Sequence, residues 1–240
     1  MKLFSEIGAV VLSAFEDGSL ANGGLVADDI GMAVKRLISP VLEPVATIVS
    51  EIAKALDIFK ENDRSEHLGQ AMEQMDKKLE NFDSINEYID YLREGIKSGE
   101  VKLIRNLSDI EKTFYTCTVT ALGIQAIDEK YQLQPSDIFW VTMGGKFQEG
   151  KITPDEINKI LEISSKNSVS SENVANYING DGMTGGQRAS GVADVIEDGL
   201  IAANPNMSDE EIASRFNELK PANSNMSYEE IASMFSGIIK

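Results

Sequence analysis

The sequence is poor in the side chains that most often build metal and catalytic sites. It has one cysteine, Cys117, and one histidine, His67, among 240 residues. A single cysteine excludes an internal disulfide and any cysteine-rich zinc site, and a single histidine excludes sites that need several imidazoles. The absence of a disulfide framework fits a reducing compartment. With 42% hydrophobic residues, the chain is long enough to bury a core without cross-links.

Basic side chains are scarce relative to acidic ones. The chain has 22 Lys and Arg against 39 Asp and Glu, which gives a formal net charge of −17. The excess is spread along the chain, because residues 1–143 carry 14 basic and 24 acidic side chains and residues 144–240 carry 8 and 15. A field of this sign repels nucleic-acid phosphates and attracts basic proteins. We therefore expect no direct nucleic-acid binding, and the charge serves either solubility alone or a basic protein partner.

Long apolar runs are also absent, so we expect no membrane span. The start of the chain, residues 1–15, imitates a secretory signal peptide, and residues 19–21 imitate its cleavage site. Glu6 interrupts the apolar run, however, and we interpret this segment as the first helix. The predicted location is the cytoplasm, and secretion without a cleaved signal peptide is the alternative.

Apolar residues recur at helical spacing along most of the chain, which predicts an all-α protein, an irregular bundle of about ten to twelve helices. The clearest stripe runs from Val45 to Phe59 and predicts a central core helix. We expect Pro40 to end the preceding helix and Pro44 to open or kink the central one.

A glycine-containing turn, Gly144 to Gly150, separates long apolar segments from shorter, sharply capped ones. We therefore expect one body or two helical lobes, residues 1–143 and residues 144–240. In the second lobe, Thr153 has the pattern of an N-cap, followed by proline at the first helical position and Glu156 at the third.

Two segments suit a strand as well as a helix. Residues 113–121 are rich in β-branched side chains, and residues 138–141 form a short apolar run with the only tryptophan. A capping-box pattern from Ser108 to Glu111 precedes the first segment and favours a helix there. In such a helix, we expect the threonines to hydrogen-bond to carbonyls one turn back.

The stretch from Gly150 to Glu156 resembles the closing half of an EF-hand calcium loop, with glycine at loop position 6 and glutamate at position 12. The loop would begin at Gly145, and a second loop would begin at Asp181, 36 residues later. The oxygen ligands would be Glu149, Glu156 and Asp181. Most other ligand positions lack acids, so the resemblance implies EF-hand-like helix pairing without metal. We expect no metal site and no cofactor.

The chain closes with an internal repeat at an offset of 19 residues, which predicts helices at 207–219 and 226–239. In each copy, a serine caps the helix, a glutamate three residues later completes the capping box, and Ile and Phe at i and i+4 form the buried face. We expect two equivalent helices that dock on one surface. The first-turn acids are candidates for partner binding: Glu210, Glu211, Glu229 and Glu230.

No catalytic constellation stands out, because a Ser-His-Asp or Cys-His site would have to use His67 or Cys117. We predict an acidic, non-enzymatic protein-binding module, such as an immunity protein, an antitoxin-like inhibitor or a chaperone that neutralises a basic partner. Three alternatives stay open: a secreted effector that binds a host protein, an EF-hand-like calcium-responsive protein, and an enzyme with a carboxylate-based site.

Overall fold

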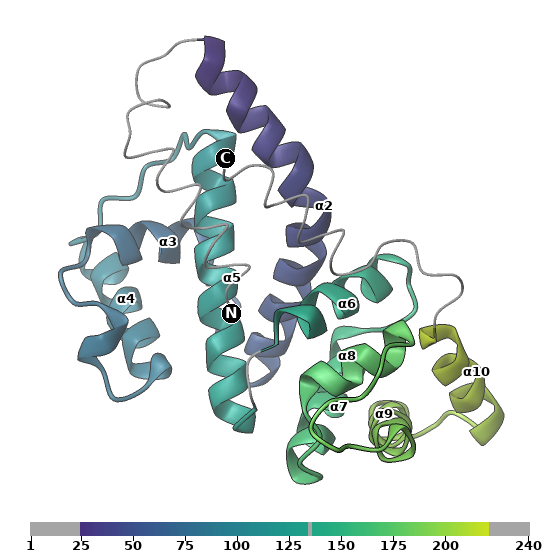
Figure 1. Cartoon of the computed structure of the whole chain (residues 1–240). Coiled ribbons are helices and arrows are strands. Elements are labelled where there is room, and N and C mark those ends of the chain that lie inside the picture. The colour runs from purple at the N-terminus through teal and green to yellow at the C-terminus, as the bar shows by residue number, and fades with distance from the viewer. Residues whose placement is uncertain (1–24, 134–135, 221–240) are drawn as a thin grey trace. The chain divides into compact units, whose positions relative to one another are not determined.

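The computed structural model describes residues 25–133 and 136–220, which form nine α-helices and no strand (Figure 1). The all-α prediction is confirmed, although the predicted number of helices is slightly higher. None of these helices is long and apolar enough to cross a membrane. The predicted helix in residues 1–15 and the second repeat copy, 226–239, lie outside the described residues. The helices are α2 (Leu25–Ala55), α3 (Ser65–Gln74), α4 (Ile85–Ser98), α5 (Asp109–Tyr131), α6 (Asp137–Gln148), α7 (Pro154–Lys166), α8 (Ser171–Asn179), α9 (Ala189–Ala203) and α10 (Asp209–Leu219), with a 3-10 turn at Leu79–Asn81.

The described chain divides within α5 into two compact units, residues 25–126 and residues 127–220. The first unit holds α2, α3, α4 and most of α5, and the second holds the end of α5 and α6 to α10. The two lobes proposed from the sequence stay a prediction. The turn expected from Gly144 is shorter than predicted, because α6 continues to Gln148 and only residues 149–153 connect it to α7.

The prediction that a helix ends before Pro40 is wrong, because α2 continues through Pro40 and Pro44. The prolines are four residues apart, so the backbone hydrogen bonds they remove lie on one side of the helix. Fully buried side chains follow directly on the same helix, and their packing offsets the loss: Val45, Ile48, Val49 and Ile52.

The central helix ends earlier than the apolar stripe predicts. Asp57 adopts a left-handed backbone conformation with φ of 61°, and the Ile58 N–H donates to the Ala53 carbonyl at 2.8 Å. This arrangement closes the last turn of α2, as a left-handed residue after a helix commonly does. Ile58 and Phe59 are nevertheless buried, so the stripe predicted core membership correctly and helix length incorrectly.

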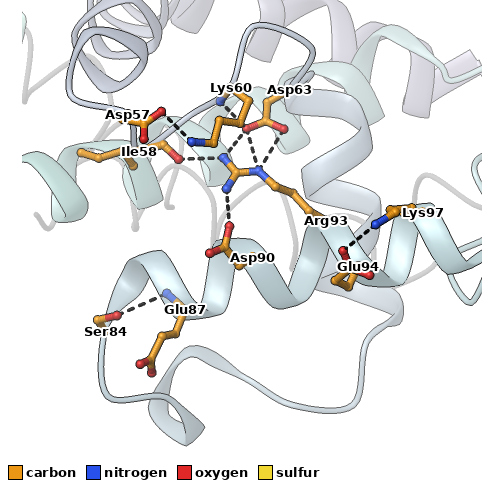
Figure 2. Close-up of polar contacts among 10 residues, drawn as sticks. All are labelled: Asp57, Ile58, Lys60, Asp63, Ser84, Glu87, Asp90, Arg93, Glu94 and Lys97. Atoms are coloured by element: carbon orange, nitrogen blue, oxygen red, sulfur yellow. Dashed lines mark hydrogen bonds and ion pairs between the residues drawn. The ribbon is translucent and has the colours of Figure 1, made fainter.

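A guanidinium joins α4 to the connection between α2 and α3 (Figure 2). Arg93 donates from Nε and Nη2 to the Asp63 carboxylate, with the shortest contact at 2.5 Å, and from Nη2 to the Ile58 carbonyl at 2.7 Å. Its Nη1 donates to Asp90 at 2.6 Å. Because Arg93 and Asp63 are both largely shielded from solvent, this network holds the connection more firmly than a surface ion pair would.

Both ambiguous segments are helical. Residues 113–121 lie in α5, which Ser108 caps by accepting from the Glu111 N–H at 3.2 Å. Thr113 and Thr118 donate to carbonyls one turn back, at 2.8 and 2.9 Å, as expected. Residues 138–141 lie in α6, and Trp140 packs there with its ring centroid 5.3 Å from that of Phe139.

The second unit is organised around a close approach of α7 and α9. A Cβ atom at Gly199 would lie 2.9 Å from the Ile160 Cα and 3.0 Å from its backbone nitrogen, so the two helix backbones touch. Apolar residues on both sides of this contact are buried: Ile157, Ile160 and Leu161 on α7, and Val192, Val195, Ile196 and Leu200 on α9. This packing fixes which face of α9 remains exposed.

We expect two alanine substitutions in α9 to have opposite effects. Gly199→Ala forces α9 away from the α7 backbone and should lower the free energy of unfolding by about 2 kcal/mol. Gly191 has open space around its Cα, so Gly191→Ala should raise that free energy by up to about 1 kcal/mol through helix propensity. Urea unfolding of both variants measures the difference. A Gly199→Ala variant as stable as Gly191→Ala would contradict the close packing.

Candidate functional site

The outer face of α9 is acidic. Asp194, Glu197 and Asp198 are exposed, and their spacing of three or four residues places them along one side of the helix. Ile201 continues this side and is 47% exposed. The last turn of α9 has no basic residue, so nothing there compensates the partial negative charge of the helix C-terminus.

A five-residue connection, 204–208, brings the end of α9 close to the start of α10 (Figure 1). The Asn204 N–H donates to the Leu200 carbonyl at 3.0 Å, and the Met207 N–H donates to the Asn204 carbonyl at 3.0 Å. Ser208 then caps α10 in the predicted capping box with Glu211. Met207 is 41% exposed and directly precedes the acidic first turn of α10.

We call this surface the acidic corner. Of the three large apolar side chains that are exposed in the described part of the chain, two, Ile201 and Met207, belong to it. The acidic corner consists of these two residues and the exposed acids around them: Glu197, Asp198, Asp209, Glu210 and Glu211.

The charge of this region is uncompensated. From Ala189 to Leu219 the chain has seven acids and a single base, Arg215, which is bound to a buried carboxylate. Some acids elsewhere have cationic partners, such as the half-buried Glu162, which pairs with Lys159 and Lys166 at 3.0 and 2.6 Å. Within the described residues, none of the acidic-corner carboxylates forms an ion pair. The corner therefore combines apolar surface with a concentrated negative field.

The buried carboxylate that Arg215 binds belongs to Glu156, at the start of α7. Glu156 is 1% exposed and accepts hydrogen bonds from the Thr153 N–H at 2.7 Å and from Asn204 Nδ2 at 3.0 Å. Arg215 donates to both of its oxygens, from Nε at 3.0 Å and from Nη2 at 3.1 Å. Burial alone raises the pKa of this carboxyl, but the bonds from Arg215, Thr153 and Asn204 outweigh burial and hold the pKa below its ordinary value.

We call this arrangement the Glu156 clasp, consisting of Glu156, Thr153, Asn204 and Arg215. It ties α10 and the end of α9 to the start of α7. Beside it, Ile212 and Leu219 are buried, and the Phe216 ring lies 6.0 Å from the Tyr177 ring of α8. The clasp thus fixes α10, and with it the acidic first turn of the corner.

The predicted oxygen ligands have other roles here. Glu149 caps α6 and pairs with Lys151 at 2.6 Å, and Glu156 belongs to the clasp. Asp181 is exposed after α8, and its N–H donates to the Asn176 carbonyl at 2.7 Å. No group of three or more His, Cys, Asp or Glu that could hold a metal ion occurs among the described residues. The EF-hand resemblance stays a prediction.

Of the predicted partner-binding residues, Glu210 and Glu211 are exposed in the first turn of α10, while Glu229 and Glu230 lie outside the described residues. Glu211 is also committed to its capping box. Sequence reasoning missed the α9 side of the corner. The sequence does contain an indication of this surface. Residues 189–219 have a single base among seven acids, and Ile201 lies next to the apolar stripe of α9.

Three candidate reactive groups are enclosed or half-buried. Cys117 is fully buried, which raises the pKa of its thiol to about 12. Burial likewise raises the pKa of Asp128 to about 7, but this carboxyl is only 5% exposed, which denies access to a substrate. His67 is half-buried in the first turn of α3, which begins at Ser65.

Comparisons of the chain with protein-family models, curated proteins and solved structures find no match. The acidic corner and its clasp therefore carry the functional argument.

We expect Arg215→Met to lower the free energy of unfolding by about 2–4 kcal/mol at neutral pH, because it leaves Glu156 buried without a cation. The wild-type advantage is present above the unfolded-state pKa of Glu156, about 4.3, and disappears as the pH falls through the lower folded-state pKa. The control is Lys166→Met. Its partner Glu162 is more exposed than Glu156, so this substitution should lower the free energy of unfolding by less than about 0.5 kcal/mol. Urea unfolding between pH 3 and pH 7 measures both, and a difference that persists unchanged at the lowest pH would contradict the electrostatic origin.

Proposed function

We propose that this chain is an acidic, non-enzymatic protein-binding module, whose acidic corner receives a basic amphipathic segment of a partner protein. One observation carries the proposal: Ile201 and Met207 are exposed within a surface whose acids have no cationic partner among the described residues. Solubility alone explains scattered acids, but it does not explain apolar side chains placed among them.

The two components of the corner have different roles in binding. Burial of the exposed parts of Ile201 and Met207 contributes about 1 kcal/mol each and slows dissociation. The surrounding carboxylates attract a basic partner and accelerate its association, and they reject nucleic acids and acidic proteins. The complementary ligand is a segment with apolar side chains on one face, flanked by Lys or Arg.

Neutralisation of a basic protein is the activity that this chemistry fits best. An immunity protein, an antitoxin-like inhibitor and a chaperone are three kinds of protein that act in this way when their partner is positively charged. Rigid presentation favours such a role, because the clasp holds α10 in place before binding and so reduces the ordering cost.

Neutralisation of four acids at the corner tests the proposal. The corner variant is Glu197→Gln, Asp198→Asn, Asp209→Asn and Glu210→Gln, which leaves the capping residue Glu211 intact. Its control changes four exposed acids elsewhere to glutamine, namely Glu61, Glu80, Glu100 and Glu129, so both variants lose the same charge. The probe is a helical peptide with leucines on one face and lysines on its flanks, and a second peptide has glutamate in place of lysine.

We expect the lysine peptide to shift backbone NMR signals of residues 197–211, and the glutamate peptide to shift none. The corner variant should lower the association rate at 50 mM salt at least tenfold, with little change in the dissociation rate, whereas the control variant should lower it less than threefold. Equal losses of association rate in the two variants, or NMR signal shifts spread over the whole protein, would mean that the negative charge attracts the peptide without a specific site. Either result would contradict the proposal.

A further inference from the structure

The surface of α7, α8 and α9 that α10 covers has a second candidate ligand in the same chain. At the repeat offset of 19 residues, the anchors Ile212, Phe216 and Leu219 correspond to Ile231, Phe235 and Ile238. The capping pair recurs as Ser227 and Glu230, and Asn204 of the clasp recurs as Asn223. The second copy therefore has an equivalent for every apolar anchor through which α10 is held.

The two copies differ at the position from which α10 itself binds the buried carboxylate. Arg215 donates to both oxygens of Glu156, and the corresponding residue in the second copy is Met234. Methionine is long enough to fill the space of the arginine stem, but it donates no hydrogen bond. With the second copy in place, Glu156 would be buried without a cation, which is strongly unfavourable.

We propose that the α10 site is a helix-docking site that accepts either copy of the repeat, and that the Arg215–Glu156 pair selects the first. Residues 226–239 are the competing ligand. Arg215 is thus a specificity-determining residue as well as a structural one. This inference does not rest on the proposed function, because it concerns only which helix of the chain occupies the site.

The chain can supply this ligand at a modest cost in loop entropy. Docking of the second copy lengthens the connection from α9 by the repeat offset, from residues 204–208 to residues 204–227. Closure of the longer loop disfavours the second copy by roughly tenfold. Loop length and the ion pair thus act in the same direction, and only the ion pair can be exchanged by mutation without altering the connection.

Hydrogen exchange measured by mass spectrometry on the full chain tests this inference, because the two copies give separate peptides. In the wild type, amides of 212–219 should exchange at least tenfold more slowly than those of 231–238. The variant Arg215→Met/Met234→Arg swaps these two residues between the copies. It should slow hydrogen exchange of the amides in 231–238 and accelerate that of the amides in 212–219, while the native mass remains that of a monomer. Adding Phe235→Ala to this variant should abolish the new protection.

The single variant Met234→Arg keeps Arg215 and therefore keeps the original docking available if the double variant unfolds. Both copies then carry the arginine and only the roughly tenfold loop cost separates them, so the second copy should displace the first about a tenth of the time. Protection of 212–219 should therefore fall to about tenfold, whereas exchange of 231–238 should slow only slightly. Three results would overturn the proposal: equal protection of both copies in the wild type, unchanged exchange of both copies in Met234→Arg, or new protection that appears only in a dimer.

Discussion

The described second unit depends on one buried carboxylate, Glu156. A buried charge without partners is among the most unfavourable features a protein core can contain, so its bonds to Thr153, Asn204 and Arg215 constrain three elements at once. The start of α7, the end of α9 and the middle of α10 must converge on this group. The α7–α9 contact at Gly199 and the burial of Ile212 and Leu219 are compatible with that convergence and reinforce it.

The same constraint shapes the surface. Arg215 is the single base between Ala189 and Leu219, and the clasp uses it internally. The outward-facing acids of α9 and α10 are consequently left without compensation, beside Ile201 and Met207. In our account, stability of the unit and the negative field of the corner follow from the placement of one arginine, and the proposed partner supplies the cations that the surface lacks.

Features that depend on neighbouring residues could be predicted from the sequence. The serine and threonine caps at Ser108, Thr153 and Ser208 all form, because a cap and its partner are three residues apart. Features set by tertiary packing could not. α2 continues through Pro40 because buried residues follow it, α6 continues past Gly144, and Glu156 meets Arg215 across 59 residues. Of the corner acids, Glu210 and Glu211 were candidates from the sequence, whereas Asp209 and the acids of α9 were not, because the exposed face of α9 is set by its packing against α7.

The most direct test of the central claim is a double-mutant cycle between Glu156→Gln and Arg215→Met. If the pair organises the unit, the free energies of unfolding should be strongly non-additive, with a coupling of about 2 kcal/mol or more at neutral pH and a double variant more stable than Arg215→Met alone. Additive effects within about 0.5 kcal/mol would show that the two residues act independently, and would contradict the account.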